Sequence, residues 1–361
     1  MVEETQGIYI HIPFCRAKCG YCDFNSYAGM EEQMAAYTAA VCAELRQYSG
    51  SADTVYFGGG TPTLLPPAEL ERIINALAAQ FHIASDAEIT LEANPATFDR
   101  ARAAAYRAMG FNRMSIGVQS FSDMLLRRLG RLHDGAQAQQ AVEAAVCAGF
   151  TNLSIDLMYA LPEQTPQMFR RDLQRLRGLP VTHVSAYGLK VEEGTPFANQ
   201  QVVVEEEDYT QMYQELCALL PDMGVEQYEI SNFARSGAAS RHNLKYWQRR
   251  PYIGLGAGAH SFDGQRRWEN ICGVADYIHA ADKRAAVEEL SAQDCLVEEL
   301  IMGMRLTKGV PETLFEQFPG GTQKAQQYRQ AGLLHQPSLG RLAFTTAGFL
   351  VSNTVLASLL P

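Results

Sequence analysis

The sequence lacks an excess of basic residues and any long uninterrupted apolar run. Lys and Arg total 30 against 40 Asp and Glu, which gives a formal net charge of −10. Binding to a nucleic-acid backbone needs clustered basic side chains, and the short pairs at 249–250 and 266–267 do not form such a cluster. The apolar tail, residues 344–360, is broken by Thr, Ser and Asn, so we expect a buried terminal helix. These absences exclude nucleic acid as the main partner and predict no transmembrane segment.

A secretory signal is also missing from the first residues. Residues 1–12, MVEETQGIYIHI, are acidic and have no basic region ahead of an apolar run. Hydrophobic residues make up 47% of the chain and charged residues 19%, the balance of an ordinary globular protein. We therefore expect a cytoplasmic protein, or one inside an organelle if a targeting peptide precedes this sequence.

Cysteine occurs eight times, but without the pattern of a disulfide framework. Such frameworks belong to small secreted chains, and this chain of 361 residues is neither small nor evidently secreted. Five cysteines stand alone in apolar surroundings, and we expect them to be buried structural thiols: Cys42, Cys147, Cys217, Cys272 and Cys295. The other three, Cys15, Cys19 and Cys22, lie close together in HIPFCRAKCGYCDFNSY, and this cluster indicates a chemical role.

The first half of the chain alternates short β-rich runs with longer helical patterns. Six runs are predicted as strands: residues 8–12, 53–57, 88–92, 112–117, 152–157 and 182–189. The segments between them carry apolar residues at helical spacing. Alternation of this kind builds a parallel sheet with helices outside it. The sequence therefore predicts an α/β fold, a partial (β/α)6 barrel similar to part of a TIM barrel.

The pattern changes after residue 235, which divides the chain into three predicted parts. Residues 1–235 form the partial barrel, and residues 236–287 form a Gly-rich connecting segment. Residues 288–361 begin with a helical pattern and form a small, mainly helical C-terminal domain.

Polar residues follow or end five of the predicted strands. The clustered cysteines follow the first strand and Gly58-Gly59-Gly60 follows the second, Glu92 ends the third, Gln119 follows the fourth and Asp156 ends the fifth. In parallel α/β folds, the loops at the carboxyl ends of the strands carry the functional groups. These residues are therefore predicted to meet at one mouth of the barrel.

The cysteine cluster allows three interpretations. A disulfide would leave one thiol unpaired and suits the expected compartment poorly. A structural zinc ion needs a fourth ligand, and no second cysteine pair occurs at zinc-finger spacing, although His11 could serve in principle. An iron–sulfur cluster is held by thiolates. Three of them bind three irons of a 4Fe-4S cube, and the fourth iron stays open to a ligand from outside the protein.

The spacing Cys-x3-Cys-x2-Cys after a first strand, with Tyr21 before the last cysteine, resembles the motif of radical S-adenosylmethionine enzymes. This resemblance implies that Cys15, Cys19 and Cys22 hold a 4Fe-4S cluster, and that S-adenosylmethionine binds its open iron through its amino and carboxylate groups. One electron from the cluster then cleaves the sulfonium to methionine and a 5′-deoxyadenosyl radical. GGGTPTLL at 58–65 resembles the superfamily's Gly-rich segment, where missing Cβ atoms let backbone groups approach a ligand.

Motifs along most of the chain resemble one branch of this superfamily, which contains oxygen-independent coproporphyrinogen III oxidase and the haem chaperone HemW. They are YIHIPFCRAKCGYCDF, GGGTPT, LEANP, FNRMSIGVQSF, LGRLH, IDLMYALPEQT, YEISNFA and HNLKYW. The resemblance implies that Tyr9 and Tyr21 flank the cluster and cofactor, and that Gly59, Gly60, Thr61 and Glu92 hold S-adenosylmethionine. It also implies that Gln119, Arg131 and Asp156 match polar residues that face a second S-adenosylmethionine in the oxidase.

Three departures from the oxidase pattern favour the chaperone. Phe24 occupies the position of a further cysteine in the oxidase. Only a short stretch precedes Ile8, where the oxidase has a longer N-terminal segment. Finally, RHNLKYW at 241–247 resembles the HNxxYW motif associated with haem binding in the chaperone.

The HNxxYW resemblance implies a haem ligand in this chain. Imidazole is a good axial ligand for haem iron, and aromatic rings can pack on a porphyrin face. His242 would be the ligand, with Tyr246 and Trp247 as packing surface and Asn243 as polar support. His260, in GLGAGAHSF, is a weaker alternative ligand.

We therefore predict a haem chaperone that binds a 4Fe-4S cluster, S-adenosylmethionine and haem, and that delivers haem to acceptor haemoproteins. An electron donor is a further expected partner, and a homodimer is one possible assembly. The alternative is oxygen-independent coproporphyrinogen III oxidase, a radical enzyme that oxidatively decarboxylates propionate side chains. A radical enzyme with an unrelated substrate is the third candidate, and no residue is assigned a catalytic role.

Overall fold

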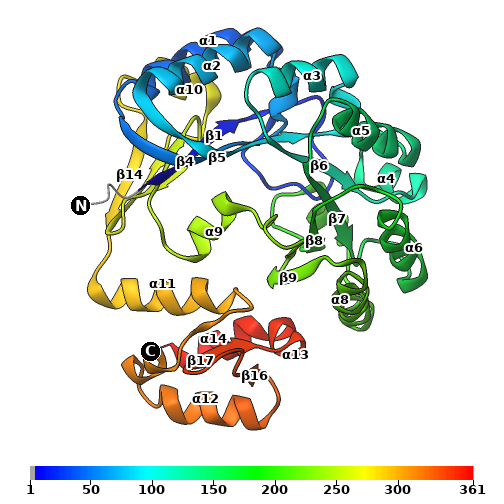
Figure 1. Ribbon diagram of the computed structural model, residues 1–361, viewed down its shortest axis with the longest axis vertical. Helices are drawn as coiled ribbons and strands as arrows, with labels where there is room; N and C mark the ends of the chain where they lie inside the picture. The colour runs from blue at the N-terminus through cyan, green and yellow to red at the C-terminus, as the bar shows by residue number, and fades with distance from the viewer. Residues whose placement is uncertain (1–4, 361) are drawn as a thin grey trace.

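The computed structural model describes residues 5–360 and shows an α/β fold built on one large sheet (Figure 1). The sheet has 12 strands in the order β14-β13-β12-β11-β1-β4-β5-β6-β7-β8-β10-β9. Six neighbouring strands run parallel: β1 (Gln6–Ile12), β4 (Gly50–Gly59), β5 (Phe81–Ala93), β6 (Arg113–Gln119), β7 (Asn152–Tyr159) and β8 (His183–Gly188). Each of them corresponds to one of the six strands predicted from the sequence.

Helices connect the parallel strands and cover the outer, convex face of the sheet (Figure 1). The helices between β1 and β10 are α1 (Met34–Leu45), α2 (Pro67–Gln80), α3 (Arg100–Ala108), α4 (Asp123–Leu129), α5 (Gly135–Cys147), α6 (Pro166–Leu176), α7 (Pro196–Asn199) and α8 (Glu206–Leu219). Within residues 5–360 the end strands of the sheet, β14 and β9, do not pair with each other. The predicted partial barrel is confirmed, as an open arc.

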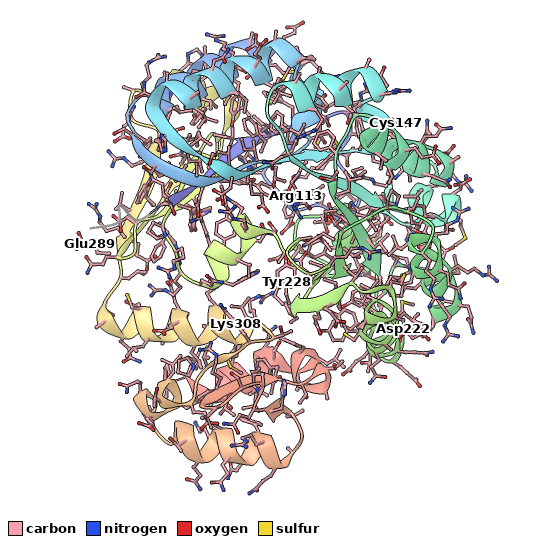
Figure 2. The ribbon with its side chains drawn as sticks, in the orientation of Figure 1. Arg113, Cys147, Asp222, Tyr228, Glu289 and Lys308 are labelled. Atoms are coloured by element: carbon pink, nitrogen blue, oxygen red, sulfur yellow. The ribbon has the colours of Figure 1, made fainter. Side chains whose placement is uncertain are left out.

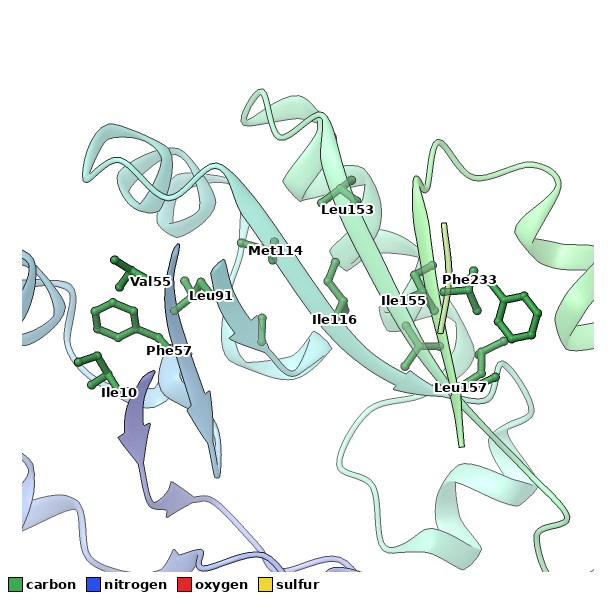
Figure 3. Packing of buried hydrophobic residues seen from close by; sticks show 14 of the residues in the cluster. Ile10, Val55, Phe57, Leu91, Met114, Ile116, Leu153, Ile155, Leu157 and Phe233 are labelled. Atoms are coloured by element: carbon green, nitrogen blue, oxygen red, sulfur yellow. The ribbon is translucent and has the colours of Figure 1, made fainter. Parts of the chain in front are cut away.

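The main core lies between this arc and its helices, and Figure 3 shows part of it. Apolar side chains from successive strands, such as Ile10, Phe57, Leu91 and Ile155, are fully buried there. Parallel strands that are covered on both faces are near-continuous apolar runs. Burial of each such side chain contributes about 1.5–3 kcal/mol, so this layer fixes the strand ends that carry the predicted site.

Further strands extend the sheet at both ends. They are β9 (Glu226–Glu229) and β10 (Asn232–Ala234) beyond β8, and β11 (Tyr252–Leu255), β12 (His260–Phe262), β13 (Arg266–Asn270) and β14 (Arg284–Glu289) beyond β1. Strand β11 pairs parallel with β1, and the other added strands are antiparallel to their neighbours. The boundaries predicted at 235 and 287 stay predictions, but the segment between them supplies strands to the sheet.

The C-terminal part lies below the open side of the arc in the view of Figure 1. After α10 (Val274–His279) and β14, its elements are α11 (Ala292–Met304), β15 (Val310–Pro311), α12 (Gly321–Gln330), β16 (Leu334–His335), β17 (Arg341–Phe344), α13 (Thr346–Leu350) and α14 (Ser352–Leu359). This part is mainly helical, as predicted, and the apolar tail buries Phe349, Val355 and Leu359. Among the residues that the structure describes, no helix combines the length and apolarity needed to cross a bilayer.

The lone cysteines only partly match their prediction as buried thiols. Cys42 is buried, and Cys217 and Cys295 are half-buried. Cys147 and Cys272 are exposed, so for these two the prediction is wrong. Cys147 is the last residue of α5, and Cys272 lies in the loop after β13. Apolar neighbours in the sequence do not decide which way one side chain points at the end of an element.

Candidate functional site

The loop after β1 carries the three clustered cysteines. Cys15 ends the short strand β2 (Phe14–Cys15), which pairs with β3 (Tyr27–Ala28). The N–H of Cys22 donates to the carbonyl of Cys19 (3.2 Å), and the N–H of Gly20 donates to the carbonyl of Leu129 (3.1 Å) at the end of α4. Because the loop is held at β2 and at α4, its thiols occupy defined positions.

The three thiols line one cavity of ≈ 400 Å³ at the carboxyl ends of the parallel strands, here called the cysteine cavity. All three are free thiols, and burial raises the pKa of Cys15 and of Cys22. In residues 5–360 no group of three or more His, Cys, Asp or Glu side chains is placed to hold a single metal ion. In a 4Fe-4S cube each thiolate binds a different iron, and three thiols on one cavity can supply three such ligands.

The Gly-rich segment runs beside the cysteine loop. A Cβ atom on Gly60 would lie 2.7 Å from the carbonyl oxygen of Phe14 and 3.1 Å from Cys15 Sγ. Gly59 has φ +114°, a conformation that residues with a side chain rarely adopt. Thr61 Oγ1 forms a hydrogen bond of 3.6 Å with Cys15 Sγ. The backbone approaches the thiol this closely because positions 59 and 60 lack side chains.

Arg131 and Asn94 connect the walls of the cysteine cavity. Arg131 Nη1 donates to Cys19 Sγ (3.6 Å), while Nη2 donates to the carbonyl of Gly117 (2.6 Å) and to Asn94 Oδ1. Asn94 Nδ2 in turn donates to Thr61 Oγ1 (2.8 Å). Arg131 Nε is buried and has no hydrogen-bond partner in the described part of the chain. A free guanidinium N–H beside three thiols fits a site for a ligand that bears a carboxylate.

Two half-buried carboxyl groups, Glu92 and Asp156, line the same cavity from β5 and β7. The Tyr56 hydroxyl donates to Glu92 Oε1 (2.6 Å), and the Gly59 N–H donates to Oε2 (3.2 Å). Burial raises the pKa of Glu92 to about 7, although these hydrogen bonds oppose the shift. Ser115 Oγ donates to Asp156 Oδ1 (3.0 Å), and burial raises the pKa of Asp156 as well. Acids of this kind can change protonation when a cationic group binds beside them.

Gln119, at the end of β6, has a strained backbone. Its φ is +66°, which is uncommon for a residue with a side chain. The pairing of β6 with β7 shifts register between Gly117 and Gln119. Strain of this kind concentrates at functional sites, and Gln119 lines the cysteine cavity.

The structure brings most of the residues predicted for the site to this one cavity. They are Cys15, Cys19, Tyr21, Cys22, Gly59, Gly60, Thr61, Glu92, Gln119, Arg131 and Asp156. The two others, Tyr9 and His242, line a second cavity instead. The roles assigned to all of these residues stay predictions.

This second cavity, here called the α9 cavity, has a volume of ≈ 360 Å³. Helix α9 (Arg241–Trp247) carries the HNLKYW motif, lies on the concave side of the arc and forms one wall (Figure 1). The lining residues are Tyr9, Tyr56, Glu92, Tyr187, Glu229, Ser231, Asn232, His242, Asn243, Tyr246, Trp247 and Arg305. Glu92 and Tyr187 line both cavities, so the two cavities are neighbours.

His242 is fully buried in the wall of the α9 cavity. Its Nδ1 forms a hydrogen bond with Thr54 Oγ1 (2.9 Å), and its Nε2 forms one with the Tyr246 hydroxyl (2.8 Å). Burial lowers the pKa of His242 to about 3, so the imidazole is neutral. The ring of Tyr9 stacks beside it with a centroid distance of 6.3 Å. Because both ring nitrogens have partners, iron ligation would require the Tyr246 hydroxyl to leave Nε2 or the Thr54 hydroxyl to leave Nδ1.

Some residues of the two cavities escape prediction from the sequence. Asn94 directly follows β5, so the strand-end rule that points to Glu92 could have found it. Tyr187 lies one residue before the end of β8, as Glu92 does on β5, so the same rule could have found it. Arg305 follows α11 and carries no such signal. The alternative haem ligand, His260, lies on β12 outside both linings, with Nε2 3.7 Å from Glu269 Oε2.

Comparison with known proteins places the chain among characterised families. Residues 9–176 match the model of the Radical SAM superfamily. "Heme chaperone HemW" of Lactococcus lactis subsp. lactis is 34% identical, over 98% of this chain and 97% of its own length. "Radical S-adenosyl methionine domain-containing protein 1, mitochondrial" of Bos taurus is 35% identical, over 99% of this chain and 88% of its own. "Heme chaperone HemW" of Escherichia coli is 39% identical, over 70% and 69%.

A solved structure of coproporphyrinogen III oxidase (HemN) from Escherichia coli, described as a radical SAM enzyme, superposes with a TM-score of 0.85. It covers 99% of this chain and 90% of that chain at 22% identity, which shows the fold alone. Membership in the superfamily implies a 4Fe-4S cluster and S-adenosylmethionine. The three thiols, the unpartnered Arg131 Nε and the space left by Gly60 fit these groups. The chain belongs to the radical SAM superfamily and, through its full-length relatives, to the family of proteins named heme chaperone HemW.

Proposed function

We propose that the protein is a haem chaperone that holds a 4Fe-4S cluster and S-adenosylmethionine in the cysteine cavity and binds haem at the α9 cavity. The observation that carries this proposal is the shared wall: Glu92 and Tyr187 line both cavities. Relatives named heme chaperone support it, because one of them matches 98% of this chain. Transfer of haem to acceptor haemoproteins in the cytoplasm, an electron donor and a homodimeric assembly belong to the proposal and rest on the resemblance.

In the cysteine cavity, the three clustered cysteines would hold the cluster. When bound, the cluster and S-adenosylmethionine supply one-electron chemistry. Arg131 Nε, which lacks a partner within residues 5–360, suits the carboxylate of the cofactor. Glu92 suits its ammonium group or ribose hydroxyls, because an anionic oxygen accepts hydrogen bonds from either. Gln119 and Asp156 line the remaining wall, where a second S-adenosylmethionine would bind.

In the α9 cavity, haem ligation by His242 needs one local rearrangement. The Tyr246 hydroxyl occupies Nε2 at 2.8 Å from the same helix. Rotation of the Tyr246 side chain would free Nε2 of His242. The lowered pKa of His242 keeps the imidazole neutral, and therefore able to bind iron, at neutral pH. Tyr9 and Trp247 would then offer aromatic faces to the porphyrin.

Haem titration of anaerobically reconstituted protein, followed at the Soret band, tests this proposal. Wild type should bind haem, and His242→Ala should shift the band or weaken binding because the axial nitrogen is lost. Tyr246→Phe should strengthen binding, because it removes the hydroxyl that competes for Nε2. Tyr252→Phe is the matched control: its ring packs 4.6 Å from that of Tyr246, but no hydrogen bond joins it to His242.

The outcomes of this titration test the choice of His242 as axial ligand and the chaperone function separately. An unchanged band in His242→Ala would show that the axial ligand is another residue, with His260 the next to test. Wild type that binds no haem would refute the chaperone proposal itself. Haem-loaded protein should also transfer haem to apomyoglobin, detected as the Soret band of the acceptor.

A turnover assay distinguishes the chaperone from the oxidase. With intact cluster, S-adenosylmethionine and reductant, the protein should not convert coproporphyrinogen III to protoporphyrinogen. The reason lies at Phe24, which stands where the oxidase pattern has a further cysteine and is 64% exposed at the rim of the cysteine cavity. Turnover at about 1 per second or faster would overturn the chaperone proposal.

A further inference from the structure

The α9 cavity contains four buried polar atoms that have no hydrogen-bond partner in residues 5–360. They are Glu229 Oε2, Asn232 Oδ1, Trp247 Nε1 and Arg305 Nε. Glu229 is fully buried, and Asn232 is 3% exposed. Buried polar groups in folded proteins nearly always have partners. Four such atoms in residues that line one cavity therefore indicate that the cavity takes a polar ligand group.

Arg305 supplies this cavity with a cation that forms no ion pair within residues 5–360, although it lies near enough to Glu229 to lower the pKa of that acid. Its guanidinium carbon lies 4.6 Å from the centre of the Trp247 ring. The acid on the same wall, Glu229, is engaged through Oε1 with the N–H of Ser231 (3.1 Å) and with the Asn232 amide. Burial raises the pKa of Glu229 to about 7, so it carries less negative charge at neutral pH than an exposed glutamate. Glu229 therefore compensates the charge of the guanidinium only in part, and the guanidinium can bind an anion from outside.

The backbone at Arg305 is fixed against the barrel. The N–H of Ile230 donates to the carbonyl of Arg305 (3.0 Å), and the N–H of Thr307 donates to the carbonyl of Tyr228 (3.1 Å). Figure 2 shows Tyr228 and Lys308 in the region where α9, β9 and the C-terminal part meet. A cation held on a rigid backbone loses little conformational freedom when a ligand binds.

We propose that Arg305 and the Trp247 indole N–H bind a propionate carboxylate of haem. This inference rests on the proposed function, because it takes haem as the ligand of the α9 cavity. A guanidinium binds a carboxylate through a planar fork of N–H groups, and the indole nitrogen acts only as a donor. The two stacked side chains thus each have a donor without a partner, and one carboxylate has an oxygen for each of them.

The cavity suits one propionate-bearing edge of the macrocycle. Its volume of ≈ 360 Å³ is at the small end of ligand pockets. The two acceptors without partners, Glu229 Oε2 and Asn232 Oδ1, would repel a second anion in the same cavity. The cavity therefore suits a single carboxylate, and water can donate hydrogen bonds to these two acceptors.

Comparing haem with haem dimethyl ester, whose propionates are uncharged, tests the carboxylate contact in the full-length protein. Wild type should bind haem roughly ten- to a hundredfold tighter than the ester, the range of a charged hydrogen bond. Arg305→Met removes the charge and should abolish this preference while leaving the ester affinity unchanged. Arg267→Met is the matched control, because that guanidinium stacks over Phe262 at 5.5 Å but pairs with Glu298 outside the cavity lining. It should keep the preference.

Equal affinity of wild type for both ligands, or a preference that survives Arg305→Met, would overturn the inference and leave the proposed function standing. Wild type that binds neither ligand would overturn both. If Arg305→Met does not fold, Trp247→Phe serves as the test, because it lacks the indole N–H. This variant should bind haem more weakly and haem dimethyl ester as tightly as wild type does. An equal loss of affinity for both ligands would overturn the inference. If Arg305 instead binds the carboxylate of S-adenosylmethionine, the cofactor should no longer change the electron paramagnetic resonance spectrum of the reduced cluster in Arg305→Met. That result would also overturn the inference.

Discussion

At the scale of single residues, the missing side chain of Gly60 determines how closely the backbone approaches Cys15. A Cβ atom there would lie 2.7 Å from the backbone oxygen of Phe14, which cannot move aside as a flexible side chain can. Gly60→Val should therefore disturb β2 and its cysteine as well as the space for a ligand. We expect lower iron content after anaerobic reconstitution, and a weaker effect of S-adenosylmethionine on the electron paramagnetic resonance spectrum of the reduced cluster.

Gly178→Val is the control for this substitution. A Cβ atom at Gly178 would meet only the carbonyl oxygen of Arg175, at an ordinary contact distance of 3.9 Å. Both readouts should stay at the wild-type level. Full iron content and a normal spectrum in Gly60→Val would contradict the role given to Gly60.

The cysteines should separate into cluster ligands and other thiols in the same assay. Replacing Cys15, Cys19 or Cys22 by Ala removes a thiolate, so iron and sulfide should fall from about four of each per chain to near zero. Cys42→Ala removes a small buried thiol, and should keep the cluster while lowering the free energy of unfolding by about 1 kcal/mol. Stoichiometric zinc without iron uptake would contradict the cluster.

The residues of the cysteine cavity could be predicted because they lie at strand ends, and strand ends of a parallel sheet converge. Glu92 and Asp156 belong to this group. Arg305 could not be predicted, because its approach to Trp247 depends on how the C-terminal part packs, which no local pattern encodes. Tyr9 lines the α9 cavity, where its ring lies beside that of His242, and its role beside the cluster stays a prediction.

At the scale of elements, α9 needs support from the barrel. It has 7 residues, and isolated helices of that length are not stable in water. Glu88 on β5 holds its N-terminus: Oε2 accepts from the N–H of Arg241 (3.0 Å), and Oε1 accepts from the N–H of His242 (3.0 Å). A carboxylate also suits the positive end of the helix dipole. Glu88 therefore positions the HNLKYW motif.

Glu88→Ala should loosen α9 and destabilise the protein. The change leaves two backbone N–H groups of α9 without an acceptor and removes one of the acidic neighbours of the buried Arg113, so we expect a loss of about 1–3 kcal/mol. Urea unfolding measures the loss, and amide hydrogen exchange should become faster in α9. Glu143→Ala, at an exposed position on α5, should change stability by less than about 0.5 kcal/mol. Unchanged exchange in α9 would contradict the role of Glu88.

The strands and helices of the parallel arc could be predicted because the spacing of apolar residues within each short segment indicates its secondary structure. Apolar runs of strand length alternate with helical spacing, and this pattern alone implies a parallel sheet. The pairing of β11 with β1 joins Ile253 to Ile8, and no local feature marks a contact between positions so far apart. For that reason residues 236–287 were predicted as a connecting segment, whereas β11, β12, β13 and β14 extend the sheet.

At the scale of the whole molecule, the arc and the C-terminal part together form two neighbouring cavities. The cysteine cavity is built from the arc alone, whereas the α9 cavity also needs Arg305, which follows α11. Glu92 lies in the wall that both cavities share. The charge of Glu92 therefore acts on a ligand in either cavity. The pKa of Glu92 in turn depends on both parts of the fold.

Glu92 should make the stability of the ligand-free protein depend on pH. Burial raises its pKa from the ordinary value of 4.5 to about 7, so the folded state binds the proton more tightly than the unfolded state does. Its contribution to the free energy of unfolding is fully present below the unfolded-state pKa and is lost as pH rises through about 7, an effect of about 3 kcal/mol. Glu92→Gln cannot titrate and should flatten this fall in urea unfolding measured across that pH window, while Glu143→Gln should not. A wild-type pH dependence retained in Glu92→Gln would show that groups other than Glu92 cause it, and would contradict the raised pKa.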